Sequence, residues 1–334
     1  MKILYTGSFR VGSLTEARRQ ALFDLDYETF TLDRVPYLDR GNFLYKKLQM
    51  HLHIGLGIDS YNRDLISLAL KNKPDLIYID MGLCLKPNTV KKLKLTTPNL
   101  VHYTSEFFGF RTYTYRHFFE SIDLYDCHVI TNDLVIPDLE KRGAAKILKT
   151  EFSFDTNLHK PQSLTKEEHE KYKADAVFIG HWEPETELKI AALREAGIKA
   201  KVWGPGWSRA KSLNDRKLIS PIFGEEYVKA LAGAKICLGF LSKWNFNTSA
   251  SRTFEIPACD GFLLAERTEE HLSYFEEDKE AVFFETVPEL VEKAKYFLDN
   301  EEKRLKIKDA GHKRCLNSGY SHQARMQKIL EALA

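Results

Sequence analysis

One pattern repeats along the chain: a short apolar run, a turn, and then an amphipathic helical segment. Residues 2–6 run through a glycine-bearing turn into the helical segment 14–23, and the apolar run 74–80 is later followed by the helical segment 87–95. Continuous apolar runs of this length are typical of strands covered on both faces, and their alternation with helices is typical of parallel sheets. The sequence therefore predicts an α/β fold of doubly wound parallel sheets.

The alternation is interrupted once. Residues 152–162 break it, a polar stretch from Pro161 to Lys173 follows, and the strand pattern resumes at residues 176–180. A chain of 334 residues is long enough for two ordinary domains. We predict two Rossmann-like domains facing a cleft, residues 1–158 and 159–320, followed by a terminal helix in residues 321–334.

The composition excludes several classes of protein. A net charge of +2 does not suit a nucleic-acid binder that relies on bulk charge, and five scattered cysteines suit small buried side chains in a reducing compartment. The N-terminus is too short for a signal sequence, and no apolar run approaches 18 residues. We expect a cytoplasmic protein with at most peripheral contact at the inner membrane face.

Residues 251–266 are predicted to form a short helix, a turn and a buried strand. Ser249 or Ser251 can cap the helix, and the Asp260-Gly261 pair can supply its left-handed end. A helix start presents free N–H groups and a positive dipole, which together favour phosphate.

Two side chains on this helix suit a nucleotide. Arg252 adds a fixed cation, and Glu255 lies one turn after Ser251 on the same helix face, where a carboxylate can accept two ribose hydroxyls. The alternative is a capped connector with a salt-bridged glutamate.

Three further loops follow predicted strands of the second domain, at residues 180–184, 204–207 and 241–245. The carboxyl ends of parallel strands meet at one sheet edge, so we expect these loops to converge there and to bind a nucleoside diphosphate without a metal ion or a permanently bound cofactor. Trp203 and Trp207 would form aromatic walls. The alternatives are a core position for Trp203 and a solvated side chain for Lys243. The candidate binding residues are Gly180, His181, Trp203, Gly204, Lys243, Ser251, Arg252 and Glu255.

In the first domain, Glu106 and Asp80 follow predicted strands and are the candidates for a general base, with Glu106 the leading one. His102 alternates with core positions and suits a hydrogen-bonded strand residue. The sequence lacks a G-x-G-x-x-G fingerprint, a P-loop, an H-x-x-x-H pair and a G-x-S-x-G elbow. Hydrolase and metalloenzyme functions therefore have no support.

The second-domain motifs resemble those of the CgeB-like, spore-maturation-protein-like group of GT-B glycosyltransferases (glycosyl transferases family 1). Looser matches extend into the first domain. The motifs that carry the resemblance are Val-Phe-Ile-Gly-His-Trp-Glu at 177–183, Val-Trp-Gly-Pro-Gly-Trp at 202–207, Ser-Arg-Thr-Phe-Glu-Ile-Pro-Ala-Cys at 251–259 and Phe-Leu-Leu-Ala-Glu-Arg at 262–267.

The resemblance implies transfer of a sugar from a nucleotide-sugar, such as a UDP- or GDP-sugar, to a glycan, lipid-linked or protein acceptor. It places the donor in the second domain and the acceptor in the first, with the terminal helix crossing back to the first domain. It also implies that Glu255 binds the ribose. Asp260 stands where relatives have glycine, and Asn247 stands where related retaining enzymes have a glutamate, so retention or inversion stays open.

Two other functions fit the same fold. One is a nucleotide-sugar epimerase, and the other is a catalytically silent protein that binds a nucleotide-sugar.

Overall fold

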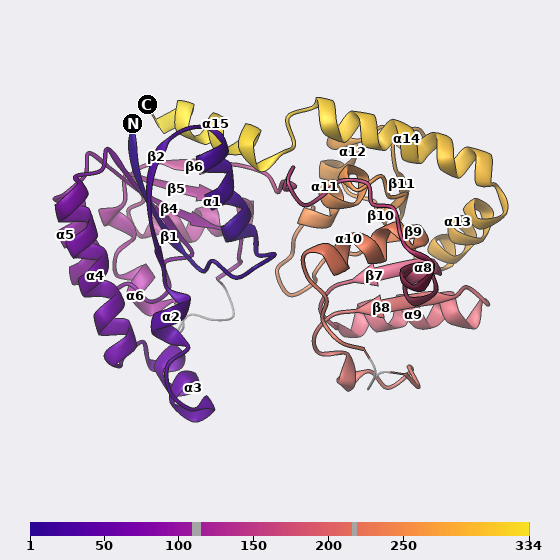
Figure 1. The fold of residues 1–334 in the computed structure, drawn as a ribbon, viewed down its shortest axis with the longest axis horizontal. Coiled ribbons are helices and arrows are strands. Elements are labelled where there is room, and N and C mark those ends of the chain that lie inside the picture. Colours follow the sequence, from indigo (N-terminus) through magenta and orange to yellow (C-terminus); the bar gives the residue numbers. More distant parts are fainter. Residues whose placement is uncertain (109–114, 216–218, 334) are drawn as a thin grey trace. The chain divides into compact units, whose positions relative to one another are not determined.

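The computed structural model describes residues 1–108, 115–215 and 219–333. The chain forms two compact units (Figure 1): unit 1 comprises Met1–Glu151 and Gln323–Ala334, and unit 2 comprises Phe152–His322. The expected boundaries, after residues 158 and 320, lie a few residues away. Residues 152–158 join unit 2 because Phe154 forms a parallel bridge with Ser321 and its carbonyl accepts the His322 N–H at 2.9 Å.

The described part of unit 1 contains a six-stranded sheet whose neighbouring strands are all parallel. Register is set by pairs such as Tyr5 opposite Tyr78. The short edge strand β6 was not predicted. The strand order is β2 (Glu28–Asp33), β1 (Lys2–Gly7), β3 (Leu76–Asp80), β4 (Asn99–Thr104), β5 (Cys127–Ile130) and β6 (Ile147–Lys149).

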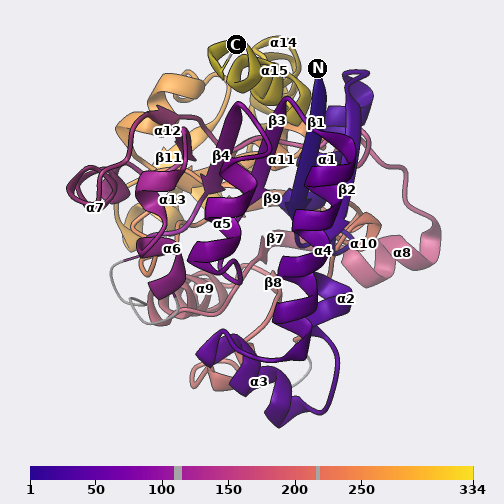
Figure 2. The same cartoon turned by 90° about the vertical axis from the view of Figure 1, so that its left-hand side faces the viewer.

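Helices cover both faces of this sheet, as Figure 2 shows from the side of unit 1. Alternate strand residues point to opposite faces, so one core holds Ile3 and Tyr78 and the other holds Leu4 and Ile77. The first core is closed by α1 (Leu14–Asp24) and α15 (His322–Leu333), and the second by α4 (Leu56–Asn72) and α5 (Pro87–Lys94). The other described helices of unit 1 are α2 (Val35–Leu38), α3 (Phe43–Leu52), α6 (Arg116–Phe119), η1 (Ile122–Leu124), η2 (Asp133–Val135) and α7 (Ile136–Lys141).

Unit 2 has a five-stranded sheet among its described residues, and its strand pairs are also parallel. The predicted fold class, two doubly wound parallel-sheet units, is confirmed. The strand order is β11 (Val282–Phe284), β10 (Leu263–Glu266), β9 (Ala234–Gly239), β7 (Ala174–Ile179) and β8 (Ala200–Trp203).

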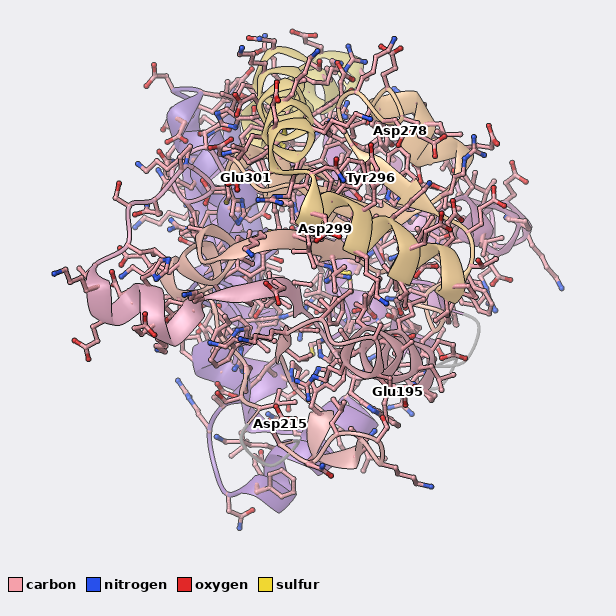
Figure 3. The ribbon with its side chains drawn as sticks, turned by 90° about the vertical axis from the view of Figure 1, so that its right-hand side faces the viewer. Glu195, Asp215, Asp278, Tyr296, Asp299 and Glu301 are labelled. Atoms are coloured by element: carbon pink, nitrogen blue, oxygen red, sulfur yellow. The ribbon has the colours of Figure 1, made fainter. Side chains whose placement is uncertain are left out.

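The main core of unit 2 lies between this sheet and the helices α9 (Pro184–Glu195) and α13 (Val287–Asp299), with Phe178 and Leu238 facing Leu193 and Leu290. Figure 3 shows the side of unit 2 where Glu195, Asp299 and Glu301 lie, and these carboxylates are exposed. The remaining helices are α8 (Lys166–Tyr172), η3 (Trp207–Arg209), α10 (Glu225–Ala232), α11 (Ser251–Ala258), α12 (Glu269–Tyr274) and α14 (Glu301–Asn317).

The polar stretch that the sequence analysis assigned to a linker contains a regular helix, α8, so that part of the prediction was wrong. The Thr165 hydroxyl accepts the Glu168 N–H at 3.2 Å, and the Glu168 carboxylate accepts the Thr165 N–H at 2.9 Å. This reciprocal capping box stabilises a helix start without any apolar run. The local signal Thr-x-x-Glu was present in the sequence.

Within the described ranges, no helix is both long enough and apolar enough to span a membrane.

Candidate functional site

The loops that follow β7, β8 and β9 are joined to one another at the carboxyl edge of the unit 2 sheet. The Trp182 N–H donates to the Pro205 carbonyl at 3.0 Å, which links the first two loops. Buried Glu183 accepts the Ser242 hydroxyl at 2.6 Å and the Lys243 N–H at 2.8 Å, which links the first and third. The expected convergence of these loops is therefore present in the structure.

Two more glutamates, Glu187 and Glu266, complete this framework, and neither was predicted as a site residue. Glu187 accepts hydrogen bonds from the Trp182 indole, the Lys211 N–H, and the N–H and hydroxyl of Ser212, at 2.6–2.7 Å. Burial alone would raise the pKa of Glu187, but these hydrogen bonds outweigh it and lower the pKa to about 2. A carboxylate held in this way keeps its charge and fixes the loops.

Glu266, at the end of β10, holds two lysines. Its carboxylate accepts Lys189 and Lys243, each at 2.8 Å, and the Leu241 N–H at 3.1 Å. Lys243 was expected to face phosphate, yet the structure shows its ammonium paired with Glu266. The side chain remains 51% exposed.

Gly180 and Gly204 lie in direct contact, and this contact requires glycine at position 204. A Cβ on Gly204, whose φ is +142°, would lie 2.0 Å from the Gly180 carbonyl oxygen. The Gly180 N–H donates to the Trp203 carbonyl at 2.9 Å, and the Trp207 indole donates to the Gly180 carbonyl at 2.9 Å. Both glycines therefore have a packing role that the sequence alone did not reveal.

The start of α11 has no side-chain cap. Its N-cap residue is Ala250, with φ −148° and ψ 169°, so neither Ser249 nor Ser251 caps the helix as the sequence suggested. Thr253 instead accepts the Ala250 N–H at 3.1 Å and contacts His271 Nε2 at 2.9 Å. The Thr253 N–H donates to the Ala250 carbonyl at 3.0 Å. The N–H groups of Ser251 and Arg252 are not satisfied by a side-chain cap, which leaves them able to bind an anion.

Arg252 lies beside this helix start. Its Nη2 donates to the Phe240 carbonyl at 2.7 Å, its Nη1 donates to the Ile179 carbonyl at 3.4 Å, and the guanidinium lies over the Phe178 ring at 5.3 Å. Buried Nε has no hydrogen-bond partner among the described residues, and no described carboxylate pairs with this guanidinium.

His181 adjoins the same charge. Partial burial first, and then the charge of Arg252, lower the pKa of His181, whereas Glu183 opposes the shift. The guanidinium of Arg252 thus disfavours a second positive charge on His181.

Glu255 lies one turn further along α11 and is nearly buried, with 9% of its side chain exposed. Its Oε2 accepts the Tyr227 hydroxyl at 2.7 Å, and its Oε1 lies 4.0 Å from His159 Nε2. Burial first, and then the charge of Glu255, raise the pKa of Tyr227 well above its ordinary value. This phenol therefore remains a hydrogen-bond donor.

The tryptophans differ from the expected aromatic wall. Trp207 is fully buried in the core of unit 2. Trp203, at the end of edge strand β8, packs on Tyr172 with ring centroids 6.0 Å apart, and its buried Nε1 has no partner among the described residues.

The Asp260-Gly261 pair supplies the left-handed end of α11, as the sequence predicts. The left-handed residue is Asp260, with φ +58°, and its carboxylate pairs with Lys308 at 2.7 Å. Gly261 is required for space, because a Cβ there would lie 3.0 Å from the Ile256 carbonyl.

In unit 1, the Asp80 side chain is fully buried, and its carboxylate already accepts hydrogen bonds from three side chains. Its carboxylate accepts Arg18 Nε at 2.7 Å, the Tyr5 hydroxyl at 2.5 Å and the Thr15 hydroxyl at 3.2 Å. Its side chain has 0% exposure, and the paired Arg18 has 7%. A carboxylate enclosed by an arginine and two hydroxyls anchors the strand end, and this geometry argues against the role of general base.

Glu106 is in a different environment. It follows β4, is half-buried, and accepts the Tyr115 hydroxyl, while its N–H donates to the Thr104 hydroxyl at 3.2 Å. His102 is buried against His128 and Phe118, as expected for a strand histidine. Among the residues described, no group of three or more His, Cys, Asp or Glu side chains is arranged to hold a metal ion.

Comparison with known proteins supports this architecture. Residues 186–331 match the family described as glycosyl transferase-like. Anabaena Alr3699/HepE, solved with UDP and glucose, has a TM-score of 0.62 at 13% identity, covering 100% of this chain and 99% of that one. No curated protein matches the sequence significantly.

Two other solved structures show the same fold. The sucrose-phosphate synthase from Thermosynechococcus elongatus has a TM-score of 0.66 at 12% identity and covers 99% of this chain and 98% of that one. A putative UDP-N-acetylglucosamine 2-epimerase from Listeria monocytogenes has a TM-score of 0.54 at 14% identity, with coverage of 99% and 95%. The chain has the GT-B fold, and at these identities the likeness concerns the fold alone.

Proposed function

We propose that this protein is a glycosyltransferase that takes its sugar from a nucleotide-sugar bound to unit 2. The observation that carries the proposal is the uncapped start of α11 beside Arg252, a guanidinium that no described carboxylate neutralises. Helix N–H groups and a fixed cation at one point suit a diphosphate, and Glu255 one turn away suits the ribose. The helix dipole and Arg252 would do the work of a divalent ion, so binding would be metal-independent.

Several finer features belong to the same proposal. The donor would be a UDP-sugar, because Alr3699/HepE was solved with UDP and with UDP-glucose, and GDP-sugars form the second group to test. We place the protein in the CgeB-like group, with a glycan, lipid-linked or protein acceptor. All five cysteines are free and buried, which suits a cytoplasmic location.

Glu106 would be the general base that activates the acceptor. It follows the end of a parallel strand, where ligands of such sheets bind, and its carboxylate is only half-buried. Asp80, the other candidate, is already saturated by donors. The Tyr115 hydroxyl would hold the Glu106 carboxylate in place.

The test is release of free nucleotide from UDP- and GDP-sugars, with and without a panel of glycan and lipid-linked acceptors, in the presence of EDTA. We expect release that requires an acceptor and survives EDTA. Glu106→Gln should lower kcat by about a hundredfold or more without changing UDP affinity, because a base acts in the transition state.

Glu120→Gln, at an exposed position of the same unit, is the matched control and should behave like wild type. Interconversion of the donor sugar without acceptor would show an epimerase instead. UDP binding with neither reaction would show a silent binding protein, and unchanged turnover in Glu106→Gln would remove Glu106 from the mechanism.

A further inference from the structure

Glu255 has unused hydrogen-bonding capacity in a nearly enclosed place. A carboxylate offers about four acceptor positions. Among the residues that the structure describes, the Tyr227 hydroxyl on Oε2 is the one side-chain donor to this carboxylate. A carboxylate that is 9% exposed and has a single donor is costly unless a ligand supplies others.

His159 points a hydrogen-bond donor toward the other oxygen. Its Nδ1 accepts the Asp155 N–H at 2.9 Å, so the hydrogen of the neutral ring must be on Nε2. The Asp155 carbonyl also accepts the His159 N–H at 2.7 Å, which closes a tight turn and fixes the ring. Nε2 lies 4.0 Å from Glu255 Oε1, which is too far for a direct hydrogen bond.

The three side chains form one cluster. The His159 ring also meets the Tyr227 ring edge-on, with centroids 5.8 Å apart. An oxygen placed about 2.8 Å from both Nε2 and Oε1 satisfies the hydrogen-bond lengths of both, because the three atoms then form an ordinary triangle on the 4.0 Å base. Such an oxygen must accept one hydrogen bond and donate another, which a hydroxyl does and a ketone or ether does not.

We propose that His159 and Glu255 bind one ribose hydroxyl of the nucleotide between them, His159 as donor and Glu255 as acceptor, while Tyr227 positions the carboxylate through its other oxygen. This inference rests on the proposed function and adds His159 and Tyr227 to the proposed ribose site. It makes the site selective for ribonucleotides over their deoxy analogues. None of the three side chains takes part in the chemical step.

The experiment is equilibrium titration of UDP, 2′-deoxy-UDP and 3′-deoxy-UDP into wild type, His159→Phe and Tyr227→Phe. In wild type we expect one deoxy analogue to bind about tenfold more weakly than UDP. His159→Phe should bind UDP about tenfold more weakly, with no further loss on removal of the same hydroxyl. Tyr227→Phe should lose a few-fold for UDP, and it too should discriminate less between UDP and that analogue.

Controls separate this role from a structural one. His159→Gln retains an N–H donor and should recover part of the affinity. Tyr172→Phe removes a hydroxyl that donates to Glu226 at 3.1 Å from a buried ring, and it should leave UDP affinity unchanged. The Tyr227→Phe arm retains the ring and remains informative if His159→Phe does not fold.

The outcomes distinguish the two proposals. Wild-type binding of UDP without preference over either deoxy analogue would overturn the inference and leave the proposed function standing. Equal loss of UDP and both analogues in His159→Phe would also overturn it. Failure of wild type to bind UDP, GDP or ADP would overturn the proposed function together with the inference.

Discussion

At the scale of single residues, the buried glutamates of unit 2 have different tasks. Glu187 accepts four hydrogen bonds and Glu183 accepts one on each oxygen, from neighbouring loops, whereas one oxygen of Glu255 has no side-chain donor among the described residues. All three glutamates are buried, so burial does not show which of them can bind a ligand. The number of donors already bound to each carboxylate separates a group that fixes the fold from one that can bind a ligand.

Glu187 makes the stability of unit 2 depend on pH. The pKa of Glu187 is about 2 in the folded protein, against an ordinary value of 4.5 in the unfolded chain. Its charge therefore stabilises the fold above pH 4.5, and this contribution is lost as the pH falls toward 2. Glu187→Gln should therefore lower the free energy of unfolding by about 2 kcal/mol at neutral pH. Urea unfolding of both proteins over this pH range should show the gap closing in acid.

The exposed Glu195 on the same helix provides the control, since Glu195→Gln should leave the curve unchanged. A wild-type advantage that stays constant from neutral pH to acid would contradict the assignment of the stabilisation to the charged carboxylate.

At the scale of elements, α11 lacks a stabilising side-chain N-cap at the end where the anion is proposed to bind. Ala250 has N-cap geometry without an acceptor. Ala250→Asp should stabilise the helix by about 1 kcal/mol, since its carboxylate can accept first-turn N–H groups. The same carboxylate should compete with phosphate for those groups and repel it, lowering UDP affinity about tenfold.

Thermal unfolding and UDP titration measure the two effects. Ala250→Ser, an uncharged cap, should stabilise similarly and lose less affinity than Ala250→Asp. An Ala250→Asp variant that gains stability and binds UDP as tightly as wild type would show that the diphosphate does not bind at this helix start.

The same element shows how far sequence could lead. Most strands and the helix at residues 251–258 were predictable, because apolar runs and helix periodicity are local signals. The roles proposed for Arg252 and Glu255 stay predictions. The preference of serine for N-cap positions predicts the wrong cap here, because the backbone angles of Ala250 place the N-cap at that residue. The helix α8 was missed because its capping box lies in a wholly polar stretch.

Contacts between distant segments could not be predicted in this way. The Glu266 partner of Lys243 is 23 residues away, and Tyr227 is 28 residues from Glu255. Trp207 was expected at a wall and is buried in the core. Each of these depends on how parallel strands bring loops together, which a single sequence does not specify side chain by side chain.

At the scale of the whole molecule, the last helix is structurally part of unit 1. Met326, Ile329 and Leu330 of α15 are 1–4% exposed and belong to the core with Ile3 and Tyr78. Leu330→Ala should reduce the free energy of unfolding of unit 1 by about 2–4 kcal/mol, through lost burial and a cavity. UDP affinity should not change, because the proposed donor residues lie in unit 2.

Urea unfolding monitored by limited proteolysis measures the free energy of unfolding of unit 1. UDP titration of the same preparations measures the nucleotide affinity. Gln327→Ala, on the exposed side of the helix, is the control. Native stability of Leu330→Ala, or a parallel fall in UDP affinity, would show that α15 does not act as a core element of unit 1 alone.

Because unit 1 is completed by α15 at the end of the chain, the fold limits how genes of related proteins can recombine. Glu151 ends the first stretch of unit 1, and Arg325 near the start of the second pairs with it at 2.9 Å, so both junctions with unit 2 leave unit 1 from neighbouring points. Residues 152–322 thus form a contiguous insert that can be exchanged as one cassette. A single crossover within the insert would instead pair α15 from one parent with the sheet of the other, whereas two crossovers at its ends keep each α15 with its own sheet.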